Sequence, residues 1–118
     1  GERLADYRPI PGDGIVMGCR SCPGVWGKGS LAFEHMSTVC AVDEQTGGAS
    51  YVVHGCDGGQ PGVHARTRAI VAGCGPRGDE VWCANLDASG AYEIDAADRR
   101  PTKGRRVLAF LDLDRELA

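Results

Sequence analysis

Several features that would indicate a class of function are missing from this chain. No apolar run approaches the ~18–20 residues of a membrane-spanning helix, so we expect no membrane span. No signal peptide is recognisable, although a mature chain beginning at Gly1 would have lost one. The sequence therefore leaves the cellular compartment undetermined.

A strong excess of positive charge is also missing. The formal net charge is −3, whereas a nucleic-acid-binding protein needs concentrated positive charge to neutralise phosphates. One basic cluster occurs late in the chain, and a charged turn between two strands explains it most simply. Its members are Arg99, Arg100, Lys103, Arg105 and Arg106. We therefore expect a protein partner and not a nucleic acid.

Familiar catalytic signatures are absent as well. The glycine pairs at residues 47–48 and 58–59 are not followed by the Lys-Ser/Thr pair of a phosphate-binding loop. No two carboxylates have the regular spacing that general acid–base catalysis would suggest. These absences favour a non-enzymatic protein, either a binding module or an accessory subunit of a larger assembly.

Glycine is plentiful, with 18 residues among 118. Because glycine costs roughly 1 kcal/mol relative to alanine inside a helix, this number favours tight turns over long helices. The length fits one domain over residues 1–118. Its first part, residues 1–14, is expected to be an irregular lead-in because two prolines and two glycines interrupt it.

The pattern of residues predicts an α+β fold, mainly antiparallel β with one short helix after a Cys-x2-Cys turn. Runs of β-forming residues indicate strands, which we place over residues 15–17, 50–56, 63–72, 81–86, 91–95 and 106–112. The helix is expected over residues 30–42, with Ser30 as its N-cap and Gly47 and Gly48 as its stop signal. The run from Val39 to Val42 also fits a strand.

The six cysteines offer two ways to crosslink the domain. An even number permits three disulfides, with 15 possible pairings, and some of the cysteines could instead bind a metal ion. The sequence leaves both open, so a structural metal and disulfides remain alternatives.

The metal alternative rests on a C-x2-C-x12-H-x4-C array. It comprises Cys19, Cys22, His35 and Cys40, with Trp26 after the second cysteine. The array resembles a zinc-finger-type site, in which four ligands converge on one tetrahedral ion. The resemblance implies structural zinc. The alternative is that Cys19 and Cys22 form disulfides with distant cysteines.

A hairpin is expected to bring two other cysteines together. A two-residue turn at Gly78-Asp79, with glycine first, fits a type II′ turn. Counting outward from this turn pairs Cys74 with Cys83 at a non-hydrogen-bonded position, where Cα atoms lie about 4.5 Å apart. This spacing suits a disulfide or two ligands of one metal ion.

An enzymatic alternative remains. His54 and Cys56 lie two residues apart on an expected strand, and His64 follows across a loop. Cysteine with a histidine base is the arrangement of a thiol-dependent hydrolase or transferase. Histidines that are simply satisfied on a half-buried sheet explain the same pattern.

Overall fold

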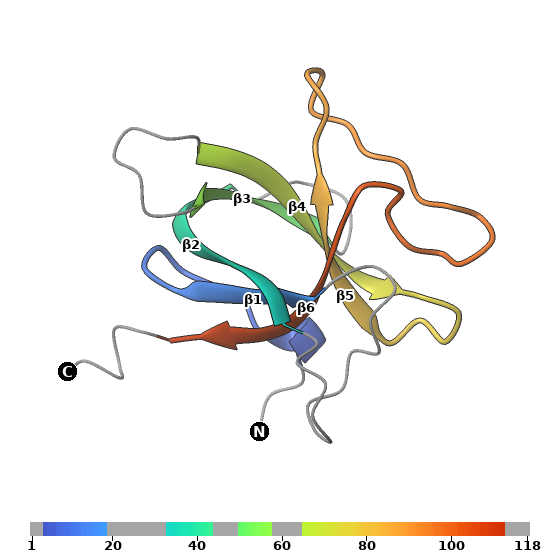
Figure 1. Ribbon diagram of the computed structural model, residues 1–118, viewed down its shortest axis with the longest axis horizontal. Helices are drawn as coiled ribbons and strands as arrows, with labels where there is room; N and C mark the ends of the chain where they lie inside the picture. Colours follow the sequence, from blue (N-terminus) through green and yellow to red (C-terminus); the bar gives the residue numbers. More distant parts are fainter. Residues whose placement is uncertain (1–3, 19–32, 44–49, 58–64, 113–118) are drawn as a thin grey trace.

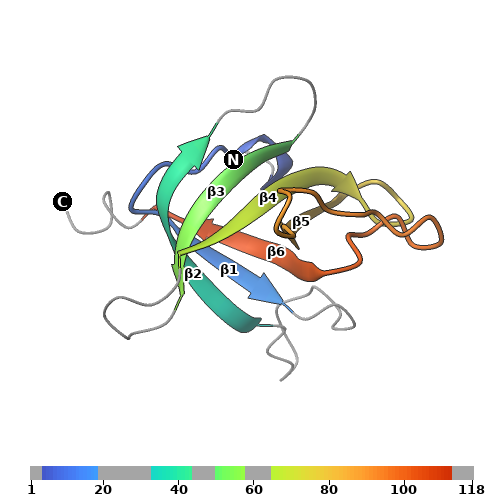
Figure 2. The same ribbon diagram turned by 90° about the horizontal axis from the view of Figure 1, so that it is seen from above.

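The computed structural model is a closed barrel of six antiparallel strands (Figure 1). It describes residues 4–18, 33–43, 50–57 and 65–112, without the side chains of 33–34, 50–57 and 65–66. Each strand pairs with the next, and β6 closes against β1, as the view from above shows (Figure 2). The elements are η1 Leu4–Asp6, β1 Gly14–Gly18, β2 Phe33–Asp43, β3 Ser50–Asp57, β4 Ala65–Cys74, β5 Glu80–Asn85 and β6 Gly104–Leu111.

The expected helix over residues 30–42 is wrong, and with it the α+β fold class. Residues 33–43 form β2, which pairs with β1 and β3. Burial along β2 alternates as in a strand, because Ser37 and Val39 are buried whereas Met36 is 40% exposed. Within the described residues the only helical element is the 3-10 turn η1. None of the described helical segments has the length and apolarity to cross a membrane.

Sequence patterns located the other barrel strands. Apolar runs at 15–17, 50–56, 81–86 and 106–112 correspond to β1, β3, β5 and β6, and the segment 63–72 overlaps β4. Side chains from five of the strands meet in one apolar core, with Leu4 and Phe110 packed against its edge. The buried members of this core are Ile15, Met17, Val39, Ile70, Val81, Cys83 and Val107.

A buried carboxylate orders the lead-in, and a ring contact packs it against the barrel. Asp13 has no exposed surface, and its Oδ2 accepts hydrogen bonds from the Tyr7 hydroxyl at 2.6 Å and the Ile10 amide at 3.0 Å. The Tyr7 ring packs 5.1 Å from that of Phe110 in β6. The segment before β1 is therefore irregular in backbone but fixed in place.

The turn between β4 and β5 is longer than the expected two-residue turn. The amide of Gly78 donates to the carbonyl of Gly75 at 3.0 Å, which puts Pro76 and Arg77 at the centre of a β-turn. Proline suits the first central position because its ring already holds φ near −65°. The turn is therefore formed by the Gly-Pro-x-Gly run of residues 75–78. The expected turn centred on Gly78 and Asp79 is not formed.

The expected pairing of Cys74 with Cys83 is wrong for the same reason. The longer turn shifts the register, so that Cys83 lies opposite Ile70 and Cys74 lies opposite Glu80. Both cysteines are buried free thiols. A change of a few residues in the turn is enough to separate a predicted cross-strand pair.

The strand expected over residues 91–95 is also wrong. This stretch belongs to a long connection between β5 and β6, in which Ile94 forms a single β-bridge with Pro101. We call residues 86–103 the arm. Figure 1 shows the arm extending away from the barrel.

Closure of the barrel between β5 and β6 predicts a strict requirement for glycine at position 104. Gly104 has φ of 155°, and a Cβ there would collide with the carbonyl oxygen of Cys83. We expect Gly104→Ala to lower the free energy of unfolding by about 3 kcal/mol or more, measured by urea denaturation.

The control is Gly90→Ala in the arm. Gly90 also has a positive φ, 84°, but apart from its chain neighbours no atom lies within 4 Å of the place that an added methyl group would take. Only the backbone strain remains, so we expect a loss of about 1 kcal/mol. Equal losses in both variants would contradict the steric explanation.

Candidate functional site

The two described members of the expected metal site do not come together. His35 lies opposite Met17 near the start of β2, and Cys40 lies five residues further along the same strand. At about 3.3 Å per residue the two positions are roughly 16 Å apart, and an odd separation puts them on opposite faces. Cys19 and Cys22 lie outside the described residues, so metal binding by these two residues stays a prediction.

Cys40 is exposed, and its sulfur is bonded in a disulfide whose other half lies outside the described side chains. A disulfide sulfur is not the thiolate that zinc requires. Nowhere in the described part of the chain do three histidine, cysteine or acidic side chains gather as a metal site would need.

The residues of the enzymatic alternative are only partly described. The backbone of β3 places Cys56 opposite Thr38 and Ala65, and His54 opposite Ala41 and Thr67. The side chains of both residues, and all of His64, lie outside the described part. A Cys–His pair among them therefore stays a prediction.

The buried thiols Cys74 and Cys83 are poor nucleophiles. The pKa of the Cys74 thiol is raised to about 11, chiefly by burial and also by the nearby Glu80 carboxylate, while Arg99 opposes the effect. Cys83 has no exposed surface and sits in the apolar core. Since the thiolate is the reactive form, neither residue suits covalent catalysis.

Alkylation checks this assignment. We expect iodoacetamide at pH 8 to leave Cys74 and Cys83 unmodified in the folded protein and to label both in 6 M guanidinium chloride, with the sites read by peptide mass spectrometry. Rapid labelling of either thiol in the folded state would contradict their structural role.

The arm is the most distinctive feature outside the barrel. Connections longer than about 12–15 residues that carry little regular structure are uncommon in compact domains and are often functional. This one has its own hydrogen bonds. The amide of Thr102 donates to Glu93 at 2.9 Å, and that of Asp95 to Arg100 at 2.8 Å. The outgoing and returning halves of the arm therefore hold each other as a short irregular hairpin.

Short acidic side chains shape the turns of the arm. The Oδ1 atom of Asp87 accepts the amide and hydroxyl of Ser89 at 2.8 and 2.6 Å, and the amide of Ala91 at 3.0 Å. These bonds hold the pKa of Asp87 below its usual range, because each favours the ionised form. Asp95 accepts the amide of Ala97 in the same manner. Such turns give the arm a defined conformation, although the arm has no apolar core of its own.

A buried carboxylate fastens the returning half of the arm to the barrel. Glu80 in β5 is 7% exposed. Its Oε1 accepts Nε of Arg100 at 2.8 Å and Nε1 of Trp82 at 2.9 Å, and its Oε2 accepts Nη2 of Arg100 at 2.9 Å. Arg106 Nη1 lies 3.5 Å from Oε2. One carboxylate thus joins β5, β6 and the arm.

Two neighbouring details support this contact. A Cβ at Gly75 would lie 2.5 Å from the carboxyl carbon of Glu80, so glycine makes room for the carboxylate. The amide of Gly75 donates to the carbonyl of Arg99 at 2.9 Å, and Arg99 has a φ of 60°. A non-glycine residue in this conformation is strained, and the adjacent bonds of the arm hold it there.

The ion pair changes the titration of Glu80. The pKa of this carboxyl is lowered from 4.5 to about 2, chiefly by the hydrogen bonds from Arg100, with Trp82 and Arg106 assisting and burial opposing the shift. A lowered pKa in the folded state means that the carboxylate stabilises the fold above about pH 4.5. This contribution is lost as the pH falls toward 2.

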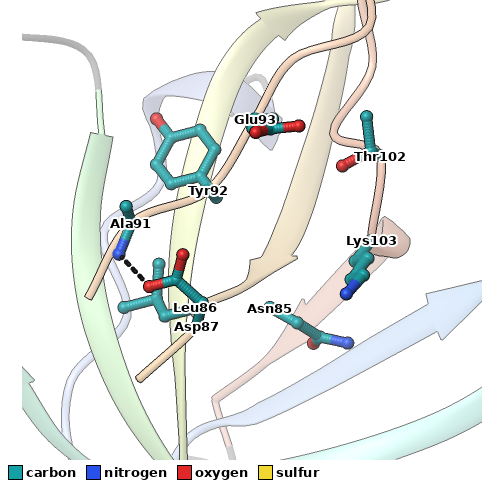
Figure 3. A pocket seen from close by; sticks show the side chains of 8 residues that line it. All are labelled: Asn85, Leu86, Asp87, Ala91, Tyr92, Glu93, Thr102 and Lys103. Atoms are coloured by element: carbon teal, nitrogen blue, oxygen red, sulfur yellow. Dashed lines mark hydrogen bonds between the residues drawn. The ribbon is translucent and has the colours of Figure 1, made fainter. Parts of the chain in front are cut away.

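The arm encloses a shallow pocket of about 230 Å³. Figure 3 shows its side chains arranged around the hollow, with Tyr92 and Asp87 on one side and Lys103 on the other. The lining comprises Asn85, Leu86, Asp87, Ala91, Tyr92, Glu93, Thr102 and Lys103. Two carboxylates against one ammonium group make the lining net negative, and the half-buried Tyr92 adds an aromatic ring.

Sequence patterns located the basic cluster but not this site. The role of Tyr92 and the pocket follow only from the folded arm. Nothing in the sequence distinguished Glu80 from an ordinary surface glutamate.

Comparison with known proteins yields no relative. No family model, curated protein or solved structure matches this chain significantly. The site's chemistry therefore has to be argued from its own residues.

The Glu80 contact predicts a pH-dependent loss of stability in Glu80→Gln. At pH 6 we expect the free energy of unfolding of this variant to be about 2–3 kcal/mol lower than that of the wild type. The difference should shrink as the pH falls from 4.5 toward 2, because the wild-type carboxylate then becomes protonated. Denaturant titrations at several pH values measure it.

The matched control is Asp79→Asn, the adjacent and exposed carboxylate. We expect a change within about 0.5 kcal/mol at every pH, as for most surface substitutions. A difference between wild type and Glu80→Gln that stayed constant from pH 6 to pH 2 would contradict the assigned pKa.

Proposed function

We propose that this protein is a non-enzymatic binding module that uses its arm to recognise a protein partner. The arm pocket takes a lysine or arginine side chain of that partner. In this role the barrel is the rigid support, and the protein serves as a module or accessory subunit of a larger assembly.

The observation that carries the proposal is the chemistry of the arm pocket. Asp87 and Glu93 supply two carboxylates against Lys103, and Tyr92 supplies a ring on the pocket wall. A cation gains from both, through charge-assisted hydrogen bonds and through attraction to an aromatic face. Neutral or anionic side chains gain from neither.

The way the arm is built supports the same conclusion. Asp87 and Asp95 pre-form the turns of the arm. Glu80 binds Arg100 where the arm returns to the barrel. A pre-organised surface loses less conformational entropy when a partner binds. Ile94 follows the pocket residue Glu93 in the chain, and its side chain is 44% exposed. It supplies apolar area for contact with a protein surface.

A small peptide tests the proposal without knowledge of the partner. We expect acetyl-Gly-Lys-Gly-amide to shift the backbone amide signals of Tyr92, Glu93 and Thr102 in a saturable manner in ¹H–¹⁵N NMR spectra. Acetyl-Gly-Glu-Gly-amide should not do so. Tyr92→Ala and Glu93→Gln should each weaken binding of the lysine peptide at least threefold.

Asp79→Asn controls for the loss of one negative charge away from the arm pocket, and it should bind as the wild type does. Equal binding of both peptides, or no shift in the arm with the lysine peptide, would contradict the proposal. Equal weakening in Glu93→Gln and Asp79→Asn, with Tyr92→Ala unaffected, would indicate general electrostatic attraction only.

A further inference from the structure

A second pocket lies over the turn between β4 and β5 and includes Arg100 of the arm. Its volume is about 270 Å³. The lining comprises Pro76, Arg77, Asp79, Glu80, Arg100 and Arg106. None of these residues lines the arm pocket, so the two pockets are separate sites.

The charge of this second pocket is opposite to that of the arm pocket. Arg77, Arg100 and Arg106 supply three guanidinium groups against the carboxylates of Asp79 and Glu80. The lining therefore has one positive charge in excess, on a chain whose formal net charge is −3. Such a local reversal of sign favours an anion.

Glu80 orients the guanidinium groups without occupying all their donors. A guanidinium has five N–H groups, and Arg100 gives Glu80 one from Nε and one from Nη2. Glu80 leaves the other three N–H groups of Arg100 unused, although the Asp98 carboxylate lies near enough to act on this guanidinium. Arg106 approaches Glu80 through Nη1 alone, at 3.5 Å. A fixed arginine fork with free donors is well suited to bind oxyanions in a bidentate manner.

Arg77 adds a further cation that no described residue neutralises. It sits at the centre of the β4–β5 turn and is exposed. Its partner across the pocket mouth is therefore solvent or a ligand. The three arginines come from three separate segments, the turn, the arm and β6, which only the folded barrel brings together.

We propose that this second pocket binds the phosphoryl group of a small phosphate monoester, with Arg77, Arg100 and Arg106 as donors. The tetrahedral group offers three terminal oxygens, which matches donors arriving from three directions. The pocket has room for one such group, whereas a nucleic acid binds through a row of phosphates along a basic surface.

The protonation of the ligand gives the binding a recognisable pH dependence. A phosphate monoester has a second pKa near 6 and carries close to two negative charges above it. Arginine stays protonated throughout. The acidic groups that face the ligand are Asp79 and Glu80, and the lowered pKa of Glu80 keeps that carboxylate charged over this range. Affinity should therefore rise several-fold between pH 5.5 and 7.5 because the ligand gains charge.

Phenyl phosphate and inorganic phosphate are the probes, with acetate as the control for any anion. We expect saturable binding of phenyl phosphate by isothermal titration calorimetry, stronger than that of acetate at equal ionic strength. Phenyl phosphate binding tighter than inorganic phosphate supports a monoester ligand, and the reverse order would overturn the monoester assignment.

Substitutions locate the site. Arg77→Gln and Arg106→Gln should each weaken phenyl phosphate binding about tenfold. Arg105→Gln is the matched control, since it removes the same charge from the neighbouring position in β6 but does not line the pocket. It should bind within twofold of the wild type.

Each other outcome counts against the proposal. Absence of saturable binding, or equal weakening by all three substitutions, would overturn it. So would RNA binding much tighter than phenyl phosphate with a steep salt dependence, which would indicate a nucleic-acid surface. Because Arg77 lies in an exposed turn, we expect Arg77→Gln to fold normally. This variant therefore tests the proposal even if Arg106→Gln fails to fold. The lysine-peptide experiment is unaffected by any of these results.

Discussion

The buried carboxylate of Glu80 is the contact on which the arrangement outside the core depends. It accepts hydrogen bonds from Arg100 in the arm and Trp82 in its own strand, and Arg106 in β6 lies close by. A carboxylate this far from water is stable only when its oxygens are fully paired. The pairing in turn holds the arm against the barrel, so a single residue couples the scaffold to its surface features.

The barrel and the arm are stabilised by different kinds of interaction. Apolar side chains from β1, β2, β4, β5 and β6 close the barrel and exclude water. The arm has no core, and it is ordered by Asx turns at Asp87 and Asp95, by a few backbone bonds and by Arg100. This division leaves the arm's side chains available for recognition, which is the usual role of loops on a rigid β scaffold.

Two pockets of opposite charge share the returning half of the arm as part of their linings. The arm pocket is lined by Asp87, Glu93 and Lys103, and the second pocket by three arginines and two carboxylates. Arg100 and Lys103, three residues apart in the returning half of the arm, contribute to different pockets. The basic cluster that the sequence displays as one run is therefore divided by the fold, and its members act in separate places.

The sequence by itself determined where most strands lie, because runs of β-branched and apolar residues carry that signal locally. It also marked Arg99–Arg106 as basic. The tertiary structure decided the rest. Residues 33–43 became a strand because β1 and β3 supply ladders on both sides, and Cys74 parted from Cys83 because the turn at Pro76-Arg77 shifted the register. Glu80, Arg100 and Arg106 met only through barrel closure, since contacts between distant segments leave no local pattern to read.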